Sequence, residues 1–229
     1  MRLSVVIPAI DEAATIDACL DRVAAQPGVF ECIVADGGSA DDTVARVRQH
    51  RGVRVIEAEP GRGRQLNAGA GLASGDTLLF LHVDTELPVH ASATIDRILH
   101  RPGVVAGGFR TWHVADKWRG TARAALLHLA DLRSRYSSVL YGDQAMFMRH
   151  ATFVRAGGFP EIALMEDIAL SKKLAKLGRI EIARRSVRVS GRRFEAAPVT
   201  QTVLVNVFPL LYAAGVSPNV LARLYGRPR

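Results

Sequence analysis

Acidic side chains come directly after two apolar segments of this chain. Asp36 follows the segment Glu31–Ala35, and Asp84 comes shortly after Leu78–His82. At the end of a buried strand, the Asp36 carboxylate could accept a hydrogen bond from the imide N–H of uracil or from a ribose hydroxyl. An uncompensated carboxylate at Asp84 would be costly, and Mg²⁺ or Mn²⁺ on nucleotide phosphates would compensate it. The alternative is that Asp84 only caps the following turn.

Two further motifs combine glycines with charged residues. Residues 61–69, GRGRQLNAG, predict a glycine-rich loop that runs into a helix. Its two arginines suit a loop that folds against a diphosphate, although a plain exposed loop would look the same. Residues 36–43, DGGSADDT, allow a tight turn and close approach of a ligand. Within them, Ser39 and Asp42 have the spacing of a capping box.

Pairs of acidic residues stand at two expected helix starts. Asp11 and Glu12 follow the first apolar run, and Glu166 and Asp167 follow the turn at 157–160. In both places the carboxylates could simply cap the helix or interact with its dipole. At the second start, one carboxylate could instead serve as a base beside a pocket.

The elements that must position these residues alternate between strands and helices. Apolar runs at 3–7, 31–35 and 53–57 predict strands, and apolar residues that recur every three to four positions between them predict amphipathic helices. This order predicts a parallel sheet with right-handed crossovers, whose ligands bind beyond the carboxyl ends of the strands. The other expected elements are strands at 77–82 and 104–110 and helices at about 115–135 and 168–177.

Length and composition are those of a globular protein with a full core. The chain has 229 residues, of which 48% are hydrophobic, and this composition excludes a disordered protein. Cys19 and Cys32 lie in apolar periodic segments and no signal peptide is evident, so we interpret them as reduced core thiols of a cytosolic protein. We expect one domain over residues 1–198 and a helical extension over 199–229, packed on the domain or on a membrane surface.

Positive charge is concentrated near the C-terminus. Residues 179–229 hold nine Arg and two Glu, which is +7 of the formal net charge of +8. Such a cluster could face nucleic acid, anionic lipid or a diphosphate, or could be a solvated surface. The apolar run Val203–Ala214 is interrupted by Asn206 and Pro209 and is too short to span a bilayer, although it could lie on one.

Six motifs occur in an order that resembles the family-2 glycosyltransferases with the GT-A fold. They are SVVIPAIDE, VADGGSADDT, GRGRQLNAG, FLHVDT, GGFPE and MEDIAL, and they extend over roughly residues 3–180. The resemblance implies an α/β fold of the GT-A type, in which a mostly parallel central sheet is flanked by helices. It also implies an inverting enzyme, and we expect a helical, basic C-terminal tail.

The resemblance assigns roles to individual residues. Asp167 corresponds to the general base, in a pair with Glu166, and Asp84 corresponds to the last aspartate of the Asp-x-Asp metal motif. The first aspartate of that motif is His82 here, which would ligate the metal, bind a ribose hydroxyl or only pack. The expected nucleotide-binding residues are Pro8, Ala9, Glu12, Asp36, Gly37, Arg64, Asn67, His82, Val83, Arg192 and Arg193.

These assignments predict transfer of a sugar from a nucleoside-diphosphate sugar to an acceptor hydroxyl, with inversion and with one divalent metal, Mg²⁺ or Mn²⁺. Asp36 favours UDP as the nucleotide. The acceptor could be a saccharide, a lipid or a small molecule. With Asp84 as the sole protein carboxylate on the ion, metal binding should be weak without nucleotide. We expect a cytoplasmic protein, with peripheral contact at the inner face of the membrane as an option.

Two other functions compete with this interpretation. A nucleotidyltransferase that makes nucleotide-sugars would share the sheet and the metal chemistry, but its glycine-rich loop has no counterpart in PAIDE at residues 8–12. A non-catalytic nucleotide-binding or nucleic-acid-binding protein is suggested by the isoelectric point of about 10.2. Against nucleic acid, the arginines are not interleaved with aromatic residues in a recognisable motif.

Overall fold

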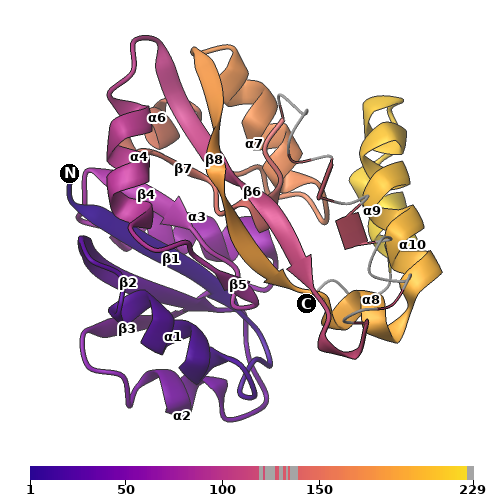
Figure 1. Ribbon diagram of the computed structural model, residues 1–229, viewed down its shortest axis with the longest axis horizontal. Helices are drawn as coiled ribbons and strands as arrows, with labels where there is room; N and C mark the ends of the chain where they lie inside the picture. The colour runs from indigo at the N-terminus through magenta and orange to yellow at the C-terminus, as the bar shows by residue number, and fades with distance from the viewer. Residues whose placement is uncertain (119–120, 122–126, 129–130, 133, 135–138, 226–229) are drawn as a thin grey trace.

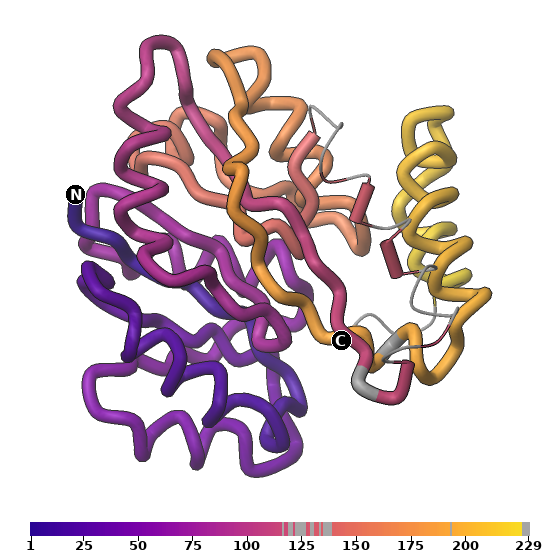
Figure 2. Tube along the Cα trace, viewed as in Figure 1, coloured from indigo at the N-terminus to yellow at the C-terminus, as the bar shows by residue number. Residues whose placement is uncertain are grey.

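The parallel half of the sheet contains the strands that end at the motifs. The computed structural model describes residues 1–118, 121, 127–128, 131–132, 134 and 139–225, apart from the side chains of Asp116 and Arg193. The sheet lies at its centre (Figures 1 and 2). Four parallel strands lie in the order β3-β2-β1-β4. Their bounds are β1 Leu3–Ala9, β2 Val29–Asp36, β3 Val53–Glu57 and β4 Thr77–Phe80. The predicted strands are confirmed.

The other half of the sheet is mixed. Strand β7 (Phe147–Arg149) runs antiparallel between β4 and β6 (Val104–Val114), and β8 (Arg179–Ser190) runs parallel to β6. The short β5 (Thr85–Glu86) pairs with β8 at the edge. Residues 179–190 therefore form a strand of the sheet, which the sequence analysis had not assigned. Val187 and Val189 are buried while their neighbour Arg188 is exposed, and the many arginines hid this alternation.

Helices cover both faces of the sheet, because successive residues of a strand point to opposite sides. Leu3, Val5 and Ile7 of β1 share a core with α1 (Ile16–Ala24) and α4 (Ala91–Leu99). Val6 belongs to the opposite core, which includes side chains of α3, α6 and α7. The bounds of the remaining helices of these layers are α2 Thr43–Val47, α3 Arg62–Leu72, α6 His150–Arg155 and α7 Glu166–Ala175.

Helix α3 replaces most of the loop that was expected at 61–69. Gly61, with φ of 127°, is the residue before the helix, and the helix then begins at Arg62. A Cβ atom at Gly69 would lie 2.4 Å from Cγ1 of Val6, and one at Gly63 would lie 2.8 Å from the carbonyl oxygen of Pro160. The glycines thus serve close packing of a helix rather than flexibility of a loop.

The C-terminal segment forms a separate group of helices at one edge of the molecule, at the right in Figure 1. It consists of α8 (Arg192–Ala196), α9 (Pro198–Ala213) and α10 (Pro218–Tyr225). Helix α9 begins at a proline, continues through Pro209, and packs with α10 around Phe208, Leu221 and Leu164. Two short 3₁₀ helices, η1 (Asp116–Trp118) and η2 (Gly142–Gln144), precede β7.

No helix within the described residues is both long enough and apolar enough to cross a membrane. The helix that was expected at about 115–135 falls largely outside the described residues. Cys19 and Cys32 are both free and buried, as predicted.

Candidate active site

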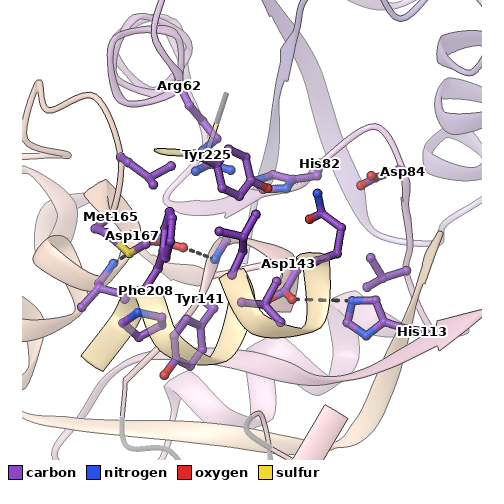
Figure 3. A pocket seen from close by; sticks show the side chains of 18 of the residues that line it. Arg62, His82, Asp84, His113, Tyr141, Asp143, Met165, Asp167, Phe208 and Tyr225 are labelled. Carbon is purple, nitrogen blue, oxygen red and sulfur yellow. Dashed lines mark hydrogen bonds and ion pairs between the residues drawn. The ribbon is translucent and has the colours of Figure 1, made fainter. Parts of the chain in front are cut away.

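Two cavities meet at the carboxyl ends of the parallel strands. The smaller is lined by Pro8, Ala9, Ile10, Glu12, Arg62, Gln65, His82, Val83 and Asp84. The larger extends from there to the C-terminal helices (Figure 3). Arg62, His82 and Asp84 line both cavities, so the two spaces adjoin at these side chains.

A buried glutamine ties together the strand ends that form the smaller cavity. Gln65 of α3 donates from Nε2 to the carbonyl oxygens of Ala9 and Ala35, at 2.8 and 3.0 Å. These acceptors lie on the neighbouring strands β1 and β2. A Cβ atom at Gly37 would lie 2.9 Å from the Gln65 amide, so the glycine permits this contact. Pro8, Ala9 and Val83, which the sequence analysis assigned to nucleotide binding, line this cavity.

Asp36 holds the turn that follows β2. Its Oδ2 accepts hydrogen bonds from the N–H groups of Gly38 and Ser39, each at 2.9 Å, and its Oδ1 accepts one from the Ser39 hydroxyl. Only 2% of Asp36 is exposed, and it is not among the residues that line the two cavities. The capping box expected from Ser39 and Asp42 is absent here, because the Ser39 hydroxyl is taken up by Asp36 and by the N–H of Asp11.

Glu12 and Arg192 form an ion pair across the mouth of the site. Nη2 of Arg192 lies 2.9 Å from both carboxylate oxygens of Glu12 and 3.9 Å from Oδ2 of Asp84. Asp11 instead accepts a hydrogen bond from the Ala40 N–H at 2.8 Å and so links two loops. The arginine predicted from the C-terminal segment is therefore at the site, whereas the side chain of Arg193 lies outside the described residues.

Asp84 is the carboxylate that both cavities share, and 14% of its side chain is exposed. Within the described residues, no group of three His, Cys, Asp or Glu side chains could hold a metal ion. One carboxylate beside His82 nevertheless fits a Mg²⁺ or Mn²⁺ ion that takes its other ligands from phosphates and water. The donor set therefore fits a nucleotide-bound metal better than a permanently resident one.

Arg62 reaches the junction of the cavities and pairs there with Glu166. The contact joins Nε of Arg62 to Oε1 of Glu166, whose side chain is 2% exposed. The structure places two predicted residues elsewhere. Arg64 pairs with Glu161 near the surface at 3.1 Å, and Asn67 bonds to the backbone N–H and C=O of Phe159. Neither lines the cavities.

The sequence pattern had contained a signal for Arg62 and Gln65. If residues 62–72 are drawn as a helix, these two lie three positions apart on one face, while Arg64 lies on another. The sequence analysis expected a loop here, and a loop gives no reason to place Arg62 rather than Arg64 at the site.

Asp167 begins the helix α7 together with Glu166, as predicted, and its carboxylate lines the larger cavity. Its Oδ2 accepts a hydrogen bond from the Gly142 N–H at 2.6 Å. Burial raises the pKa of Asp167 to about 6, with a further rise from the charge of Glu166 and an opposing effect from Arg62. At neutral pH the carboxylate is mainly ionised but binds a proton more readily than a surface aspartate, as a general base requires.

His82 and the Asp167 carboxylate both approach Gly142 on the side where a Cβ atom would lie. A Cβ atom at Gly142 would lie 2.9 Å from Cε1 of His82 and 3.3 Å from Oδ2 of Asp167. The glycine thus lets the imidazole and the carboxylate approach the same stretch of backbone. Figure 3 shows His82 at the top of the cavity and Asp167 at one end.

A second polar group lies at the other end of the larger cavity, and the sequence analysis had not predicted its members His113 and Asp131. Nδ1 of His113 lies 2.7 Å from Asp131, and its Nε2 lies 3.9 Å from Asp143, which points along the cavity in Figure 3. Burial opposes ionisation of Asp131, but its hydrogen bonds to His113 and His128 lower its pKa below the usual value. Asp131 fixes the orientation of the His113 ring.

The remaining wall of the larger cavity is mainly apolar and comes from the C-terminal segment. Phe194 of α8 and five residues of α9 contribute, together with Leu164 and Tyr225. The α9 residues are the polar Gln201 and the apolar Leu204, Val205, Phe208 and Pro209. The cavity therefore offers three carboxylates, two imidazoles and an apolar surface to one ligand.

Comparison with known proteins identifies a family. The family model for glycosyl transferase family 2 matches residues 4–158. A PGL/p-HBAD biosynthesis glycosyltransferase of Mycobacterium tuberculosis is 40% identical over 91 residues, which are 37% of this chain and 36% of the relative. Glucosyl-3-phosphoglycerate synthase of the same species is 37% identical over 93 residues, 36% of this chain and 28% of the relative. The matches thus span about a third of the curated relatives.

Solved structures share the fold. The mannosyltransferase PcManGT from Pyrobaculum calidifontis, in complex with GDP-Man and Mn²⁺, has a TM-score of 0.68 at 21% identity and covers 95% of this chain and 66% of its own. TarS of S. aureus, in complex with UDP-GlcNAc, has a TM-score of 0.64 at 22% identity, with 83% and 58% covered. These neighbours have the GT-A type of fold described above. Since the family model covers more than half of the chain, the protein belongs to glycosyl transferase family 2.

Proposed function

We propose that this protein transfers a sugar from a nucleoside-diphosphate sugar to an acceptor hydroxyl. The observation that carries the proposal is the junction of two cavities at Arg62, His82 and Asp84, with Asp167 opening into the larger one. The smaller cavity, at the strand ends, takes the nucleotide. The larger takes the acceptor, so the sugar lies between them, where bond exchange must occur.

The donor side is proposed from the residues of the smaller cavity. Pro8, Ala9 and Gln65 present the ends of two parallel strands, which is where α/β sheets bind nucleotides. UDP is the proposed nucleotide. Support comes from solved relatives that were determined with UDP-GlcNAc and with UDP. The resemblance had assigned Asp36 to the base, but in this chain its carboxylate holds the turn after β2, outside the cavity.

Asp84 and His82 would hold a divalent metal on the diphosphate. Such an ion offsets the negative charge that develops on the leaving diphosphate. Support comes from solved relatives, because PcManGT was determined with GDP-Man and Mn²⁺, and glucosyl-3-phosphoglycerate synthase with Mg²⁺ and UDP. Arg62 and Arg192 add positive charge on either side of the same region.

Asp167 is the proposed base. Its carboxylate takes the proton of the acceptor hydroxyl as that oxygen bonds to the anomeric carbon. The bond from the anomeric carbon to the diphosphate oxygen breaks on the opposite face, and its electrons leave with the diphosphate. A single displacement of this kind inverts the anomeric configuration. The hydrogen bond from the Gly142 N–H fixes the carboxylate in the cavity, and its pKa of about 6 suits proton transfer near neutral pH.

The first experiment compares the melting temperature with UDP, GDP, CMP and TDP, each with Mn²⁺, Mg²⁺ or chelator. A ligand that binds the native state raises the melting temperature, and we expect a metal-dependent rise with UDP. Hydrolysis of the matching UDP-sugar then reports activity without an acceptor. Pyrophosphate release from a nucleoside triphosphate would support a nucleotidyltransferase instead. The absence of a shift with every nucleotide would contradict the proposal.

A further inference from the structure

Exposed apolar side chains gather on the two C-terminal helices. Thirteen large hydrophobic side chains are exposed in the described part of the chain, and six of them lie in α9 and α10. The four on α9 are spaced by four, four and three positions, which places them on one face of the helix. They are Val199, Val203, Val207 and Leu210, exposed by 70, 48, 39 and 68%. We call these four residues the α9 stripe.

The opposite side of α9 is mainly apolar. Leu204, Val205 and Phe208 line the larger cavity beside Gln201, and α9 contains no charged residue. A helix with an apolar face on its outer side as well is normally covered by a partner or lies in contact with lipid. Among the described residues, the domain covers the side of α9 that faces the cavity and leaves the α9 stripe exposed, so the stripe is a candidate contact surface.

The two helices carry positive charge and no acidic residue. Among the described residues 198–225, Arg223 is the charged side chain. Arg223 is exposed on α10 between two other exposed apolar residues, Val220 and Leu224. On α7, the Lys172 ammonium lies 4.9 Å from the ring centroid of Tyr212 of α9.

We propose that α9 and α10 dock on the surface of a bilayer that contains anionic lipid. Apolar side chains on a helix flanked by basic residues insert shallowly, while the positive charges attract the headgroups. Charge favours anionic lipid over a second copy of this chain, because α9 and α10 carry Arg223 and no Asp or Glu, so that two copies of these helices would bring like charges together. The proposal concerns binding and does not depend on the sugar-transfer activity.

Flotation of the full chain with vesicles tests the proposal. We expect binding to vesicles of phosphatidylcholine with phosphatidylglycerol and much weaker binding to phosphatidylcholine alone. The double variant Val203→Gln with Leu210→Gln should lose about tenfold or more of its partition coefficient, because two apolar side chains no longer leave water. Val89→Gln with Val154→Gln is the matched control, since these side chains are 65 and 66% exposed outside the C-terminal helices.

A charge variant gives an independent test that does not alter the stripe. Arg223→Gln should weaken binding to the anionic vesicles about fivefold, and added salt should reduce the difference. Arg155→Gln, at an exposed arginine of α6, is the control and should bind as the wild type does. All variants change exposed side chains, and a thermal melt confirms their folding.

Three outcomes would overturn the proposal. The first is that the wild-type protein fails to float with anionic vesicles. The second is that the stripe and control variants bind equally well. The third is a concentration-dependent dimer that only the stripe variants abolish, which would identify a second copy of the chain as the partner.

Discussion

The two cavities are built in different ways. The smaller one is formed by strand ends and by α3, all between Pro8 and Asp84, within the residues that the family model matches. Most of the lining of the larger one, including Asp167 and the α9 residues, comes from beyond residue 158, where that match ends. Membership of the family therefore informs the nucleotide side more than the acceptor side, and the acceptor has to be argued from this chain's own residues.

The largest expected effect tests whether Asp167 belongs to the chemistry. Asp167→Asn should lower turnover by about 10²- to 10⁴-fold, because the amide cannot take up the proton. Its affinity for UDP should stay close to that of the wild type, since Asp167 is not part of the smaller cavity. Steady-state kinetics and calorimetry measure the two quantities. Asp21→Asn, at an exposed carboxylate, is the control, and near-wild-type turnover of Asp167→Asn would rule out the assignment.

A substitution in the apolar wall of the larger cavity should lower kcat/KM for the acceptor and leave UDP binding unchanged. Phe208→Ala removes a buried side chain from the larger cavity and should lower kcat/KM for the acceptor by about 10- to 100-fold, the worth of one buried aromatic contact. The dissociation constant of UDP should change by less than about twofold. Leu210→Ala, on the exposed face of the same helix, is the matched control. Equal losses for donor and acceptor would mean that the two cavities are not functionally separate.

Gln65→Leu should weaken UDP binding, whereas Phe208→Ala should weaken only the use of the acceptor. Without the amide, the hydrogen bonds to Ala9 and Ala35 are lost, so the strand ends of the smaller cavity are held less firmly. We expect roughly tenfold weaker UDP binding and a loss of about 1–2 kcal/mol in the free energy of unfolding. Calorimetry and urea titration check these values. Unchanged UDP affinity in a less stable protein would show that Gln65 is structural only.

The pH profile of the wild-type protein should reveal the base. With a pKa of about 6, Asp167 is protonated progressively below that pH, so turnover should fall about tenfold per pH unit on the acid side. Above pH 7 it should level off. Turnover at saturating donor and acceptor, measured across pH in constant ionic strength, checks this. If turnover fell only near pH 4, the base would instead be a carboxylate with its usual pKa.

The last prediction concerns stability: loss of the Asp167 carboxylate should stabilise the protein. The pKa of Asp167 is raised from 3.8 on folding, so the ionised group destabilises the native state as the pH rises from about 4 through 6. Asp167→Asn should therefore raise the melting temperature at pH 8, on the order of 6–12 °C. The difference should vanish near pH 4. A lower melting temperature at pH 8 would show that the carboxylate stabilises the fold.

The fold on the nucleotide side could be predicted from the sequence because its signals are local. Short, mainly apolar runs predicted β1 to β4, and the carboxylates at or shortly after the ends of two of them pointed to Asp36 and Asp84. Strand β8 was missed because its outward arginines obscured the alternation of buried residues. His113, Asp131 and Asp143 come together only through tertiary contacts across 18 and 30 positions of sequence, so no local pattern could join them.

The residue before α7 links the base to the distant C-terminus. Met165 has φ of 70°, a left-handed conformation that a residue with a side chain adopts at a cost of about 1–3 kcal/mol. Its side chain packs against the cluster of Leu164, Phe208 and Leu221. The contacts of α9 and α10 thus help to hold the turn at Met165, which sets the position of Asp167 at the start of α7. A protein shortened before residue 198 would be free to relax this turn, so the smallest unit able to keep the base in position extends to α10.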